Sequence, residues 1–265
     1  MSVGISILSW RGAETLRPSL QSYASAALFD EFSEAQVFLP EPDKAVLDVA
    51  NRFEIRINTI PQNLGIMENM AASAAALSTD YILMLENDCP LIEPVAEVRR
   101  QIKKSLDLLK RDDVIMSRLR SVRDPGQAFS GLAKYRSLFD GSLKSHIVKT
   151  FRPDKRRRLT GYAVYDGPKS LERHSKHFEN VGQGFYLVDA SVMPWTNQSI
   201  LIYRETFLNK IIPLARSVKT KRLANNLPNL EIELNKTPLW RNSGWKIACG
   251  PGLFTHERIG ERGYV

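Results

Sequence analysis

Between residues 3 and 109, the sequence passes four times from a short apolar segment to a segment with helical spacing. Short runs rich in β-branched residues are typical of buried strands, and apolar residues three or four positions apart are typical of helices packed on a sheet. Such alternation predicts an α/β fold with a mostly parallel, Rossmann-like central sheet and helices on both faces. The expected strands are residues 3–9, 35–39, 54–60 and 81–85, and the expected helices are residues 15–28, 43–53, 67–77 and 95–109.

The signals weaken in the second half of the chain. Glycine, proline, serine and charged residues dominate residues 118–188, which predicts functional loops or small insertions. No internal repeat or linker divides the 265 residues, and a chain of this length can bury one substantial core, so a single domain is expected. Further strands are expected at residues 114–116, 199–203 and 245–248, and further helices at residues 207–214 and 230–234.

The composition favours a cytoplasmic globular protein. Hydrophobic residues make up 43% of the chain, yet no apolar run approaches the roughly 18 residues that cross a bilayer. The opening residues 1–5 lack the basic segment of a signal peptide. The two cysteines, Cys89 and Cys249, are too few for a disulfide framework, which fits a reducing compartment.

The net charge of +8 indicates an anionic partner, which could be nucleic acid, an anionic membrane surface or a phosphorylated substrate. Nucleic acid is disfavoured, because the chain has no helix-turn-helix, aromatic RNA-binding strand or zinc-ligand pattern. Peripheral contact with the inner face of an anionic membrane stays open. Much of the excess charge lies in residues 155–158 and 219–222, for which solvated loop faces are the simpler interpretation.

Two acidic residues, Glu86 and Asp88, flank Asn87 at the expected carboxyl end of the strand 81–85. Ligands of open α/β sheets bind at that edge, and two carboxylates one residue apart can share a hard divalent cation. Such a cation bridges two phosphates and neutralises charge on a departing diphosphate. The triplet alone is a weak signal, since a solvated loop acid explains it as well. The apolar strand before it and Pro90 after it favour the metal site.

Residues 3–94 resemble the nucleotide-binding half of family 2 glycosyltransferases and their GT-A relatives. The segment VGISILSWRGAETLRPSLQSY is similar to the opening strand and first helix of that family, and NLGIMENMAASAAALSTDYILMLENDCPLIEP is similar to its Asn-x-Gly turn, Asn-led helix and D-x-D strand end. The resemblance implies a GT-A fold in which residues 1–94 bind a nucleotide diphosphate sugar and residues 95–265 bind the acceptor. It also implies a Mn²⁺ or Mg²⁺ cofactor.

By that resemblance, Asp88 and Glu86 stand where the family places its metal-binding acids. Two departures concern the nucleotide base: Glu41 stands in for the Asp that often follows the second strand, and Glu68 replaces an Arg that many members have before the helix asparagine. The residues implied to bind the nucleotide sugar are Ser9, Trp10, Arg11, Glu41, Gly65, Asn69, Glu86 and Asn87, together with Arg258 near the end of the chain.

The same resemblance implies an acceptor site and a catalytic base. Residues 196–205 resemble the loop, strand and helix start that meet the acceptor, with Trp195 and Asn197 as the expected contacts. An inverting displacement needs a carboxylate that takes the proton of the acceptor hydroxyl. Glu233 has the family's spacing before a late glycine. Glu231 competes with it, because two residues turn a side chain by about 200° around a helix, and solvated helix acids are the simpler alternative for both.

The final residues are expected to close over the site. His256 follows a glycine turn and resembles the late histidine that completes the metal shell in many GT-A enzymes, and imidazole suits Mn²⁺ better than Mg²⁺. Arg258 and Arg262 would clamp the diphosphate. A polar terminal segment has little apolar surface with which to dock, so residues 253–265 are expected to be mobile without donor. An ordinary surface histidine is the alternative.

The predicted function is metal-dependent transfer of a sugar from a nucleotide diphosphate sugar to a saccharide or lipid-linked glycan acceptor, as in polysaccharide biosynthesis. A nucleotidyltransferase is the second candidate, but such enzymes usually have a Gly-rich basic loop after the first strand, where residues 8–12 hold one glycine. A basic non-catalytic protein that binds sugar or nucleic acid is the third. The two acids Glu86 and Asp88 argue against a loss of catalysis.

Overall fold

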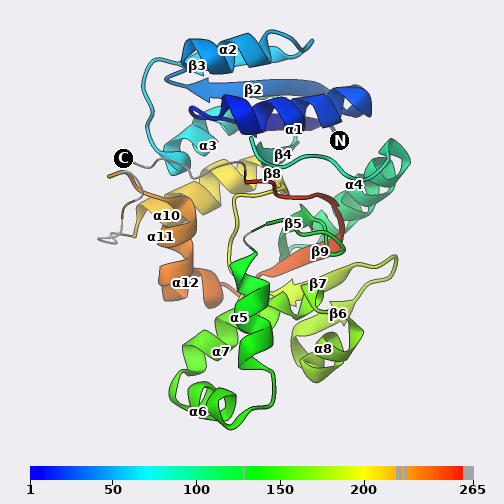
Figure 1. Cartoon of the computed structure of the whole chain (residues 1–265), viewed down its shortest axis with the longest axis vertical. Coiled ribbons are helices and arrows are strands. Elements are labelled where there is room, and N and C mark those ends of the chain that lie inside the picture. Colours follow the sequence, from blue (N-terminus) through cyan, green and yellow to red (C-terminus); the bar gives the residue numbers. More distant parts are fainter. Residues whose placement is uncertain (128, 219–222, 224–225, 259–265) are drawn as a thin grey trace.

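The computed structural model describes residues 1–127, 129–218, 223 and 226–258. The described strands form one nine-stranded sheet in the order β3-β2-β1-β4-β8-β5-β9-β7-β6 (Figure 1). The α/β fold class is confirmed: β3, β2, β1 and β4 are parallel, as expected, and the sheet is mixed beyond β4. The strands are β1 (Val3–Leu8), β2 (Glu34–Pro40), β3 (Arg56–Ile60), β4 (Tyr81–Glu86), β5 (Val114–Arg120), β6 (Phe178–Asn180), β7 (Tyr186–Asp189), β8 (Ile200–Tyr203) and β9 (Lys246–Phe254).

Helices cover both faces of the sheet and enclose two cores. Side chains of β4 alternate between the cores, as the two-residue period of a strand requires: Leu83 and Leu85 enter one core, and Ile82 and Met84 enter the other. The first face carries α1 (Ala13–Ser25), α2 (Lys44–Ala50) and α4 (Val95–Leu109); the second carries α3 (Ile66–Ala75), the π-helical turn η4 (Phe207–Ile211), α10 (Ile212–Arg216), α11 (Leu230–Lys236) and α12 (Pro238–Arg241).

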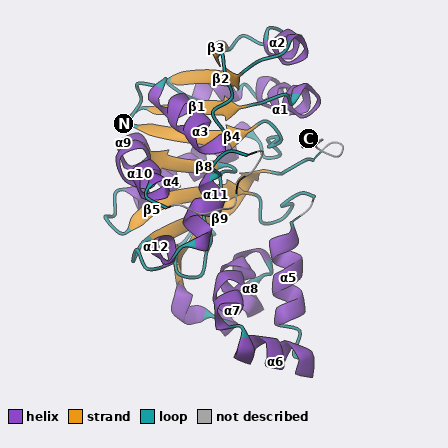
Figure 2. Cartoon of the chain, turned by 90° about the vertical axis from the view of Figure 1, so that its left-hand side faces the viewer, coloured by secondary structure: helices purple, strands orange, loops and turns teal. Residues whose placement is uncertain are grey.

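One edge of the sheet collects the segments expected to carry chemistry. β8 runs antiparallel to both β4 and β5, and β9 runs parallel to β5. The carboxyl ends of β1, β2, β4, β5 and β9 therefore share an edge with the amino end of β8, and we call it the carboxyl edge. Figure 2 shows the N-terminus at the opposite edge. Ligands of open α/β sheets bind at the carboxyl edge.

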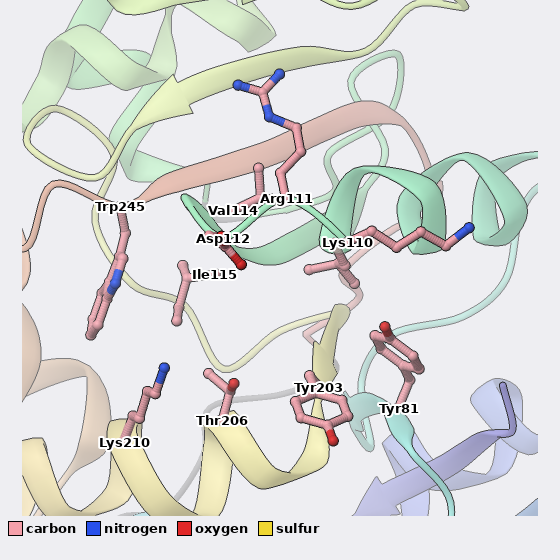
Figure 3. A pocket seen from close by; sticks show the side chains of 11 residues that line it. Tyr81, Lys110, Arg111, Asp112, Val114, Ile115, Tyr203, Thr206, Lys210 and Trp245 are labelled. Atoms are coloured by element: carbon pink, nitrogen blue, oxygen red, sulfur yellow. The ribbon is translucent and has the colours of Figure 1, made fainter.

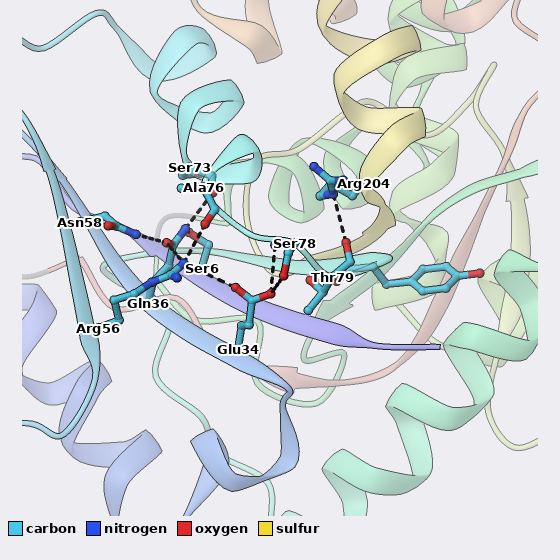
Figure 4. A network of polar contacts seen from close by, with 11 residues as sticks. Ser6, Glu34, Gln36, Arg56, Asn58, Ser73, Ala76, Ser78, Thr79 and Arg204 are labelled. Atoms are coloured by element: carbon cyan, nitrogen blue, oxygen red, sulfur yellow. Dashed lines mark hydrogen bonds and ion pairs between the residues drawn. The ribbon is translucent and has the colours of Figure 1, made fainter.

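A buried polar network joins the first three strands to α3 (Figure 4). Gln36 of β2 is fully buried, and its Nε2 donates to the Ser6 hydroxyl at 3.0 Å and to the Ser73 carbonyl at 2.7 Å. Its Oε1 accepts from Arg56 at 2.9 Å and from Asn58. Because a buried polar group left unpaired costs roughly 1–3 kcal/mol, these bonds tie α3 firmly to β1, β2 and β3.

Residues 118–188 are more regular than the sequence suggested. β5 continues to Arg120, and α5 to α8 and two strands follow. We call α5–α8 the helical insertion, and Figures 1 and 2 place it at the end of the molecule opposite β3. Its helices have only six to nine residues, too few for a clear apolar period. They are α5 (Ser130–Leu138), α6 (Leu143–Phe151), α7 (Pro153–Thr160) and α8 (Pro168–Arg173).

Shorter helical pieces connect the main elements. The basic residues 155–158 lie on α7 and not in a loop. No described helix is both long and apolar enough to span a membrane. The short pieces are η1 (Leu28–Glu31), η2 (Gly161–Tyr165), η3 (Ser175–His177) and α9 (Arg204–Thr206).

The end of the described chain corrects a further expectation. β9 continues to Phe254, which is paired with Arg120 of β5, and both Leu253 and Phe254 are fully buried. Thr255 and His256 are buried as well. Residues 253–256 therefore belong to the sheet and the core beside it, and they are not a mobile tail, because Leu253 and Phe254 supply the apolar surface that docks them.

We expect Phe254→Ala to lower the free energy of unfolding by about 3–5 kcal/mol, the usual cost of removing a buried Phe side chain. The Phe254 ring is fully buried and meets Tyr23 edge-on, with ring centres 6.1 Å apart. Phe151→Ala is the matched control, because Phe151 is exposed, and it should change stability by less than about 0.5 kcal/mol. Urea unfolding measures both. If Phe254→Ala lowers the free energy of unfolding no more than Phe151→Ala does, Phe254 is not buried in the core and β9 ends before it.

Candidate active site

Asp88 and His256 lie at the centre of the carboxyl edge. Asp88 follows β4 and is 1% exposed, and its Oδ2 lies 3.2 Å from His256 Nε2. Backbone hydrogen bonds hold the segments in place: Glu257 N donates to Asp88 O at 2.9 Å, and Gln127 N donates to His256 O at 3.0 Å. A carboxylate oxygen and an imidazole nitrogen form a pair of ligands that suits Mn²⁺.

The third expected metal ligand, Glu86, is the last residue of β4 and is half-buried. Within the described ranges, no three His, Cys, Asp or Glu side chains are grouped so that they could hold a metal ion by themselves. A cation at Asp88 and His256 would take further ligands from phosphate oxygens, as Mg²⁺ commonly does. The residues present therefore fit a metal that binds together with a diphosphate, and metal binding by Glu86 stays a prediction.

Asn87 fastens the end of β4 to the start of α1. Its Nδ2 donates to the Gly12 carbonyl at 3.2 Å and to the Thr15 hydroxyl. The backbone carbonyl of Asn87 accepts from Ser19 Oγ at 2.9 Å. A Cβ on Gly12 would lie 2.0 Å from Asn87 Nδ2, which explains the glycine at that position. The side chain amide is thus engaged in the scaffold, and a contact with the nucleotide sugar stays a prediction.

The expected nucleotide-binding residues after β1 and β2 form one cluster. Trp10 Nε1 donates to Glu41 Oε2 at 3.2 Å, and Arg11 Nη2 lies 3.5 Å from Glu41 Oε1. Arg11 and Glu41 have positive φ angles of 48° and 46°, an uncommon conformation that occurs often at functional sites. Ser9 Oγ is buried and lacks a hydrogen-bond partner in the described structure. The cluster forms one wall of the carboxyl edge.

Gly65 and Asn69 build the turn that starts α3. Asn69 Nδ2 donates to Asn63 Oδ1 at 2.7 Å, and Asn69 Oδ1 accepts from Leu64 N at 3.2 Å. Gly65 has a φ of +84°, and a Cβ there would lie 2.7 Å from Leu227 Cβ. Both residues shape this turn, and nucleotide binding by them stays a prediction.

The loop before β8 brings Asn197 to the carboxyl edge. Asn197 N donates to Glu231 Oε1 at 2.9 Å, and Asn197 Oδ1 accepts from Trp195 Nε1 at 2.9 Å. The Trp195 ring is buried, stacked on Phe207 and edge-on to Trp240. Trp195 therefore packs in the core, and an acceptor contact by Trp195 or Asn197 stays a prediction.

Glu231 and Glu233 lie in different environments on α11. Asn229 caps this helix by accepting a hydrogen bond from Ile232 N at 3.2 Å. Glu231 is half-buried and holds the loop of Asn197, whereas Glu233 is buried. Because the two carboxylates have separate surroundings, single substitutions can separate their roles.

Two buried arginines at the end of β5 also lie at this edge, and the sequence analysis missed both. Arg118 and Arg120 are 3% and 7% exposed. Burial lowers the pKa of the Arg120 guanidinium, and the charge of Arg118 acts in the same direction. The sequence did contain a signal, which is two arginines within the apolar strand VIMSRLR. Arginine is rarely buried unless it is paired, so this placement marks the two residues as candidates for a site. The expected strand stopped at residue 116 and left these positions out.

A cavity of about 300 Å³ lies at the other edge of the sheet (Figure 3). Its lining includes Tyr81 at the start of β4, Val114 at the start of β5 and Tyr203 at the end of β8. These ends lie opposite the carboxyl edge, so the cavity is separate from the site around Asp88. None of the predicted site residues lines it.

The expected diphosphate clamp is described only in part. Arg258 is exposed two residues after His256, and its contact with a diphosphate stays a prediction. The second expected clamp residue, Arg262, and the basic residues 219–222 lie outside the described residues.

No family model matches the sequence, and no curated protein sequence matches it significantly. Solved structures match nearly the whole chain. A mycobacterial protein is 14% identical, with a TM-score of 0.52 and coverage of 99% of this chain and 69% of that chain. Glucosyl-3-phosphoglycerate synthase from Mycobacterium tuberculosis, in complex with Mn²⁺, UDP and phosphoglyceric acid, is 14% identical, with a TM-score of 0.51 and coverage of 98% and 72%. The same enzyme in complex with Mg²⁺ and UDP gives 14% identity, a TM-score of 0.50 and the same coverage. The architecture of this chain is therefore the GT-A fold of nucleotide-sugar glycosyltransferases.

Proposed function

We propose that the protein transfers a sugar from a nucleotide diphosphate sugar to a hydroxyl of a saccharide or lipid-linked glycan, with Mn²⁺ or Mg²⁺ as cofactor. The observation that supports this most is the buried pair of Asp88 and His256 at the carboxyl edge of a GT-A sheet. Similar structures hold UDP with Mn²⁺ or Mg²⁺, which makes UDP the first nucleotide to test.

In the proposed inverting displacement, the residues around this pair have separate roles. Asp88 and His256 would hold the metal, which neutralises charge on the departing diphosphate when bound. Trp10 and Glu41 would receive the nucleoside, and Arg258 would contact the diphosphate. As the acceptor oxygen bonds to the anomeric carbon, the bond from that carbon to the diphosphate oxygen breaks and a carboxylate takes the hydroxyl proton.

Glu231 is our candidate for the base, with Glu233 as the alternative. Its hydrogen bond to Asn197 N, at 2.9 Å, places its carboxylate against the loop at the carboxyl edge. Glu231 is also half-buried, whereas Glu233 is 3% exposed. A base must reach the acceptor hydroxyl, and the more accessible carboxylate suits that task.

A thermal-shift panel of nucleoside diphosphates with and without Mn²⁺ tests the donor and the metal together. A ligand at about 100 times its Kd stabilises the folded state by about 2.7 kcal/mol, which should raise the Tm by about 5–10 °C for a chain of this size. UDP should require Mn²⁺ for its full effect. If no diphosphate shifts the Tm with or without metal, the proposed function is wrong.

We further propose peripheral contact with an anionic membrane through α6. Leu143, Ile147 and Phe151 follow one another at four-residue intervals along this helix and are 86%, 59% and 79% exposed. Figure 1 shows α6 at the far end of the helical insertion. Large apolar side chains with basic neighbours suit a bilayer surface with anionic lipids. Dimerisation through α6 is less favourable, because it would bring the positive charges of two copies of the chain together. The basic neighbours are Lys144, Lys149, Arg152 and residues 155–158.

Vesicle sedimentation tests this contact. The protein should sediment with vesicles of phosphatidylglycerol and phosphatidylcholine, and much less with phosphatidylcholine alone. Replacing Leu143, Ile147 and Phe151 together with serine should weaken binding by about 100-fold or more, because each buried apolar side chain is worth about 1.5–3 kcal/mol. Leu239→Ser removes another exposed leucine, on α12, and should bind as the unchanged protein does. Undiminished sedimentation of the triple variant would exclude α6 as the contact.

A further inference from the structure

The hydrogen bonds of Arg118 and Arg120 go to neutral acceptors. Arg118 Nη1 donates to Met193 Sδ at 2.8 Å. Arg120 Nε donates to the Pro125 carbonyl at 2.6 Å, and Arg120 Nη1 donates to Gln198 Oε1 at 2.9 Å. The hydrogen bonds of these two buried positive charges thus end on a thioether, a carbonyl and an amide, although the charge of the Glu231 carboxylate also acts on Arg118. A buried charge is costly unless it is paired with an opposite charge.

Each guanidinium also keeps an unused donor. Arg118 Nε and Arg120 Nη2 are buried and have no hydrogen-bond partner in the part of the chain that the structure describes. Aromatic rings provide the remaining contacts: Arg118 lies 5.9 Å from the centre of the Tyr165 ring, and Arg120 lies 4.1 Å from that of Phe129. Cation–π contacts attract a guanidinium weakly and leave its net charge uncancelled. The pair therefore offers both charge and donors to an anion.

The position of the pair links it to the candidate active site. Across the β5–β9 pairing Arg120 lies beside Phe254, two residues before His256. The loop of Pro125, which accepts from Arg120, also contains Gln127, which donates to His256 O. On the other side, Gln198 directly follows Asn197 in the loop that Glu231 holds. The arginines thus lie between the Asp88–His256 pair and the proposed base.

We propose that Arg118 and Arg120 form an anion subsite that binds a phosphate group of a substrate. Guanidinium groups present planar sets of N–H donors that match phosphate oxygens, and two of them balance the charge of a phosphate dianion. The group can come from the diphosphate of the donor or from a phosphate on the acceptor. This choice of source rests on the proposed function, whereas the binding of phosphate does not.

Inorganic phosphate is the first probe, with the full-length protein and Tm as the readout. Phosphate should raise the Tm of the unchanged protein, and Arg118→Met or Arg120→Met should remove that rise. Without phosphate, Arg120→Met should be at least as stable as the unchanged protein, because methionine replaces a buried guanidinium whose hydrogen bonds go to neutral acceptors. Arg123→Met is the matched control: Arg123 lies three residues further on, is 77% exposed and is paired with Glu93, so the rise should persist.

Calorimetric titrations then separate the two sources. UDP with Mn²⁺ reports the donor, and glycerol 3-phosphate against glycerol reports a phosphorylated acceptor. The ligand whose phosphate group binds the two arginines should bind the Met variants about 10- to 100-fold more weakly than the unchanged protein, as expected for lost charge-assisted hydrogen bonds. If UDP with Mn²⁺ fails to bind the unchanged protein while phosphate binds at the arginines, the proposed function is wrong but the anion subsite is supported.

Two results would overturn the subsite. One is that inorganic phosphate does not stabilise the unchanged protein; the other is that it stabilises the Met variants equally. Should a Met variant fail to fold, Arg120→Lys keeps the charge but loses the planar donor set, and it should bind phosphate more weakly. Phosphate binding by Arg120→Lys that equals that of the unchanged protein counts against the proposal in the same way.

Discussion

Asp88→Asn should reduce sugar transfer by more than about 100-fold, since even the outer-shell partners of a metal are typically worth about 10- to 100-fold. Asparagine keeps the volume of the side chain but removes the charge that faces His256 Nε2 at 3.2 Å. Initial rates across a Mn²⁺ titration, together with the Mn²⁺-dependent shift in Tm, measure the effect. The metal dependence of UDP binding should disappear along with the activity.

Asparagine is a better substitution than alanine at this position. A solvent-facing carboxylate could be truncated with little effect on the fold, but Asp88 is almost fully buried, and alanine would leave His256 without its neighbour. Asp107→Asn, at an exposed carboxylate of α4 paired with Lys110, is the matched control and should keep full activity. Full activity of Asp88→Asn after removal of metal would disprove the metal site.

Glu231→Gln should lower kcat by about 100-fold or more with little change in the affinity for UDP, the expected effect of losing a general base. Glutamine retains an Oε1 that can accept the hydrogen bond from Asn197 N at 2.9 Å, so the loop should keep its place. Single-turnover rates and UDP titrations measure the two effects separately.

Glu233→Gln is the matched comparison, two residues further along α11. It should keep most of the activity if Glu231 is the base. If Glu233→Gln loses kcat while Glu231→Gln keeps it, the base is Glu233, as the family spacing implies. If both variants keep full kcat, neither carboxylate takes the proton.

The local sequence predicted the parallel strands β1 to β4 well. YILMLE is apolar on both faces up to its last residue and VGISIL is apolar on one face, so both runs predict buried strands without any tertiary information. The parallel order of these strands then places Trp10, Glu41 and Asp88 at one edge. The resemblance added His256, which the structure brings to Asp88.

The remaining features depend on contacts between distant segments. β9 continues to Phe254 through a glycine- and proline-containing segment, GPG, because pairing with β5 and burial of Leu253 override its weak strand propensity. The short helices α5–α8 are held by packing, since isolated helices of that length are marginal in water. Arg118 and Arg120 escaped notice because their burial is set by Met193, Gln198 and two aromatic rings from other segments.

The reversed strand β8 has a consequence for how such a protein can diversify. It enters the sheet between β4 and β5, so the end of the loop at residues 190–199 reaches the carboxyl edge from outside the run of parallel strands β3, β2, β1 and β4. Most of this loop is buried, and only Ser191, Pro194 and Gln198 are half-buried, so these three positions can be substituted without altering β1, β2, β4 or the core packing of Trp195. If this loop binds the acceptor, as we propose, a laboratory library confined to these three positions could change the acceptor preference while the donor preference is kept.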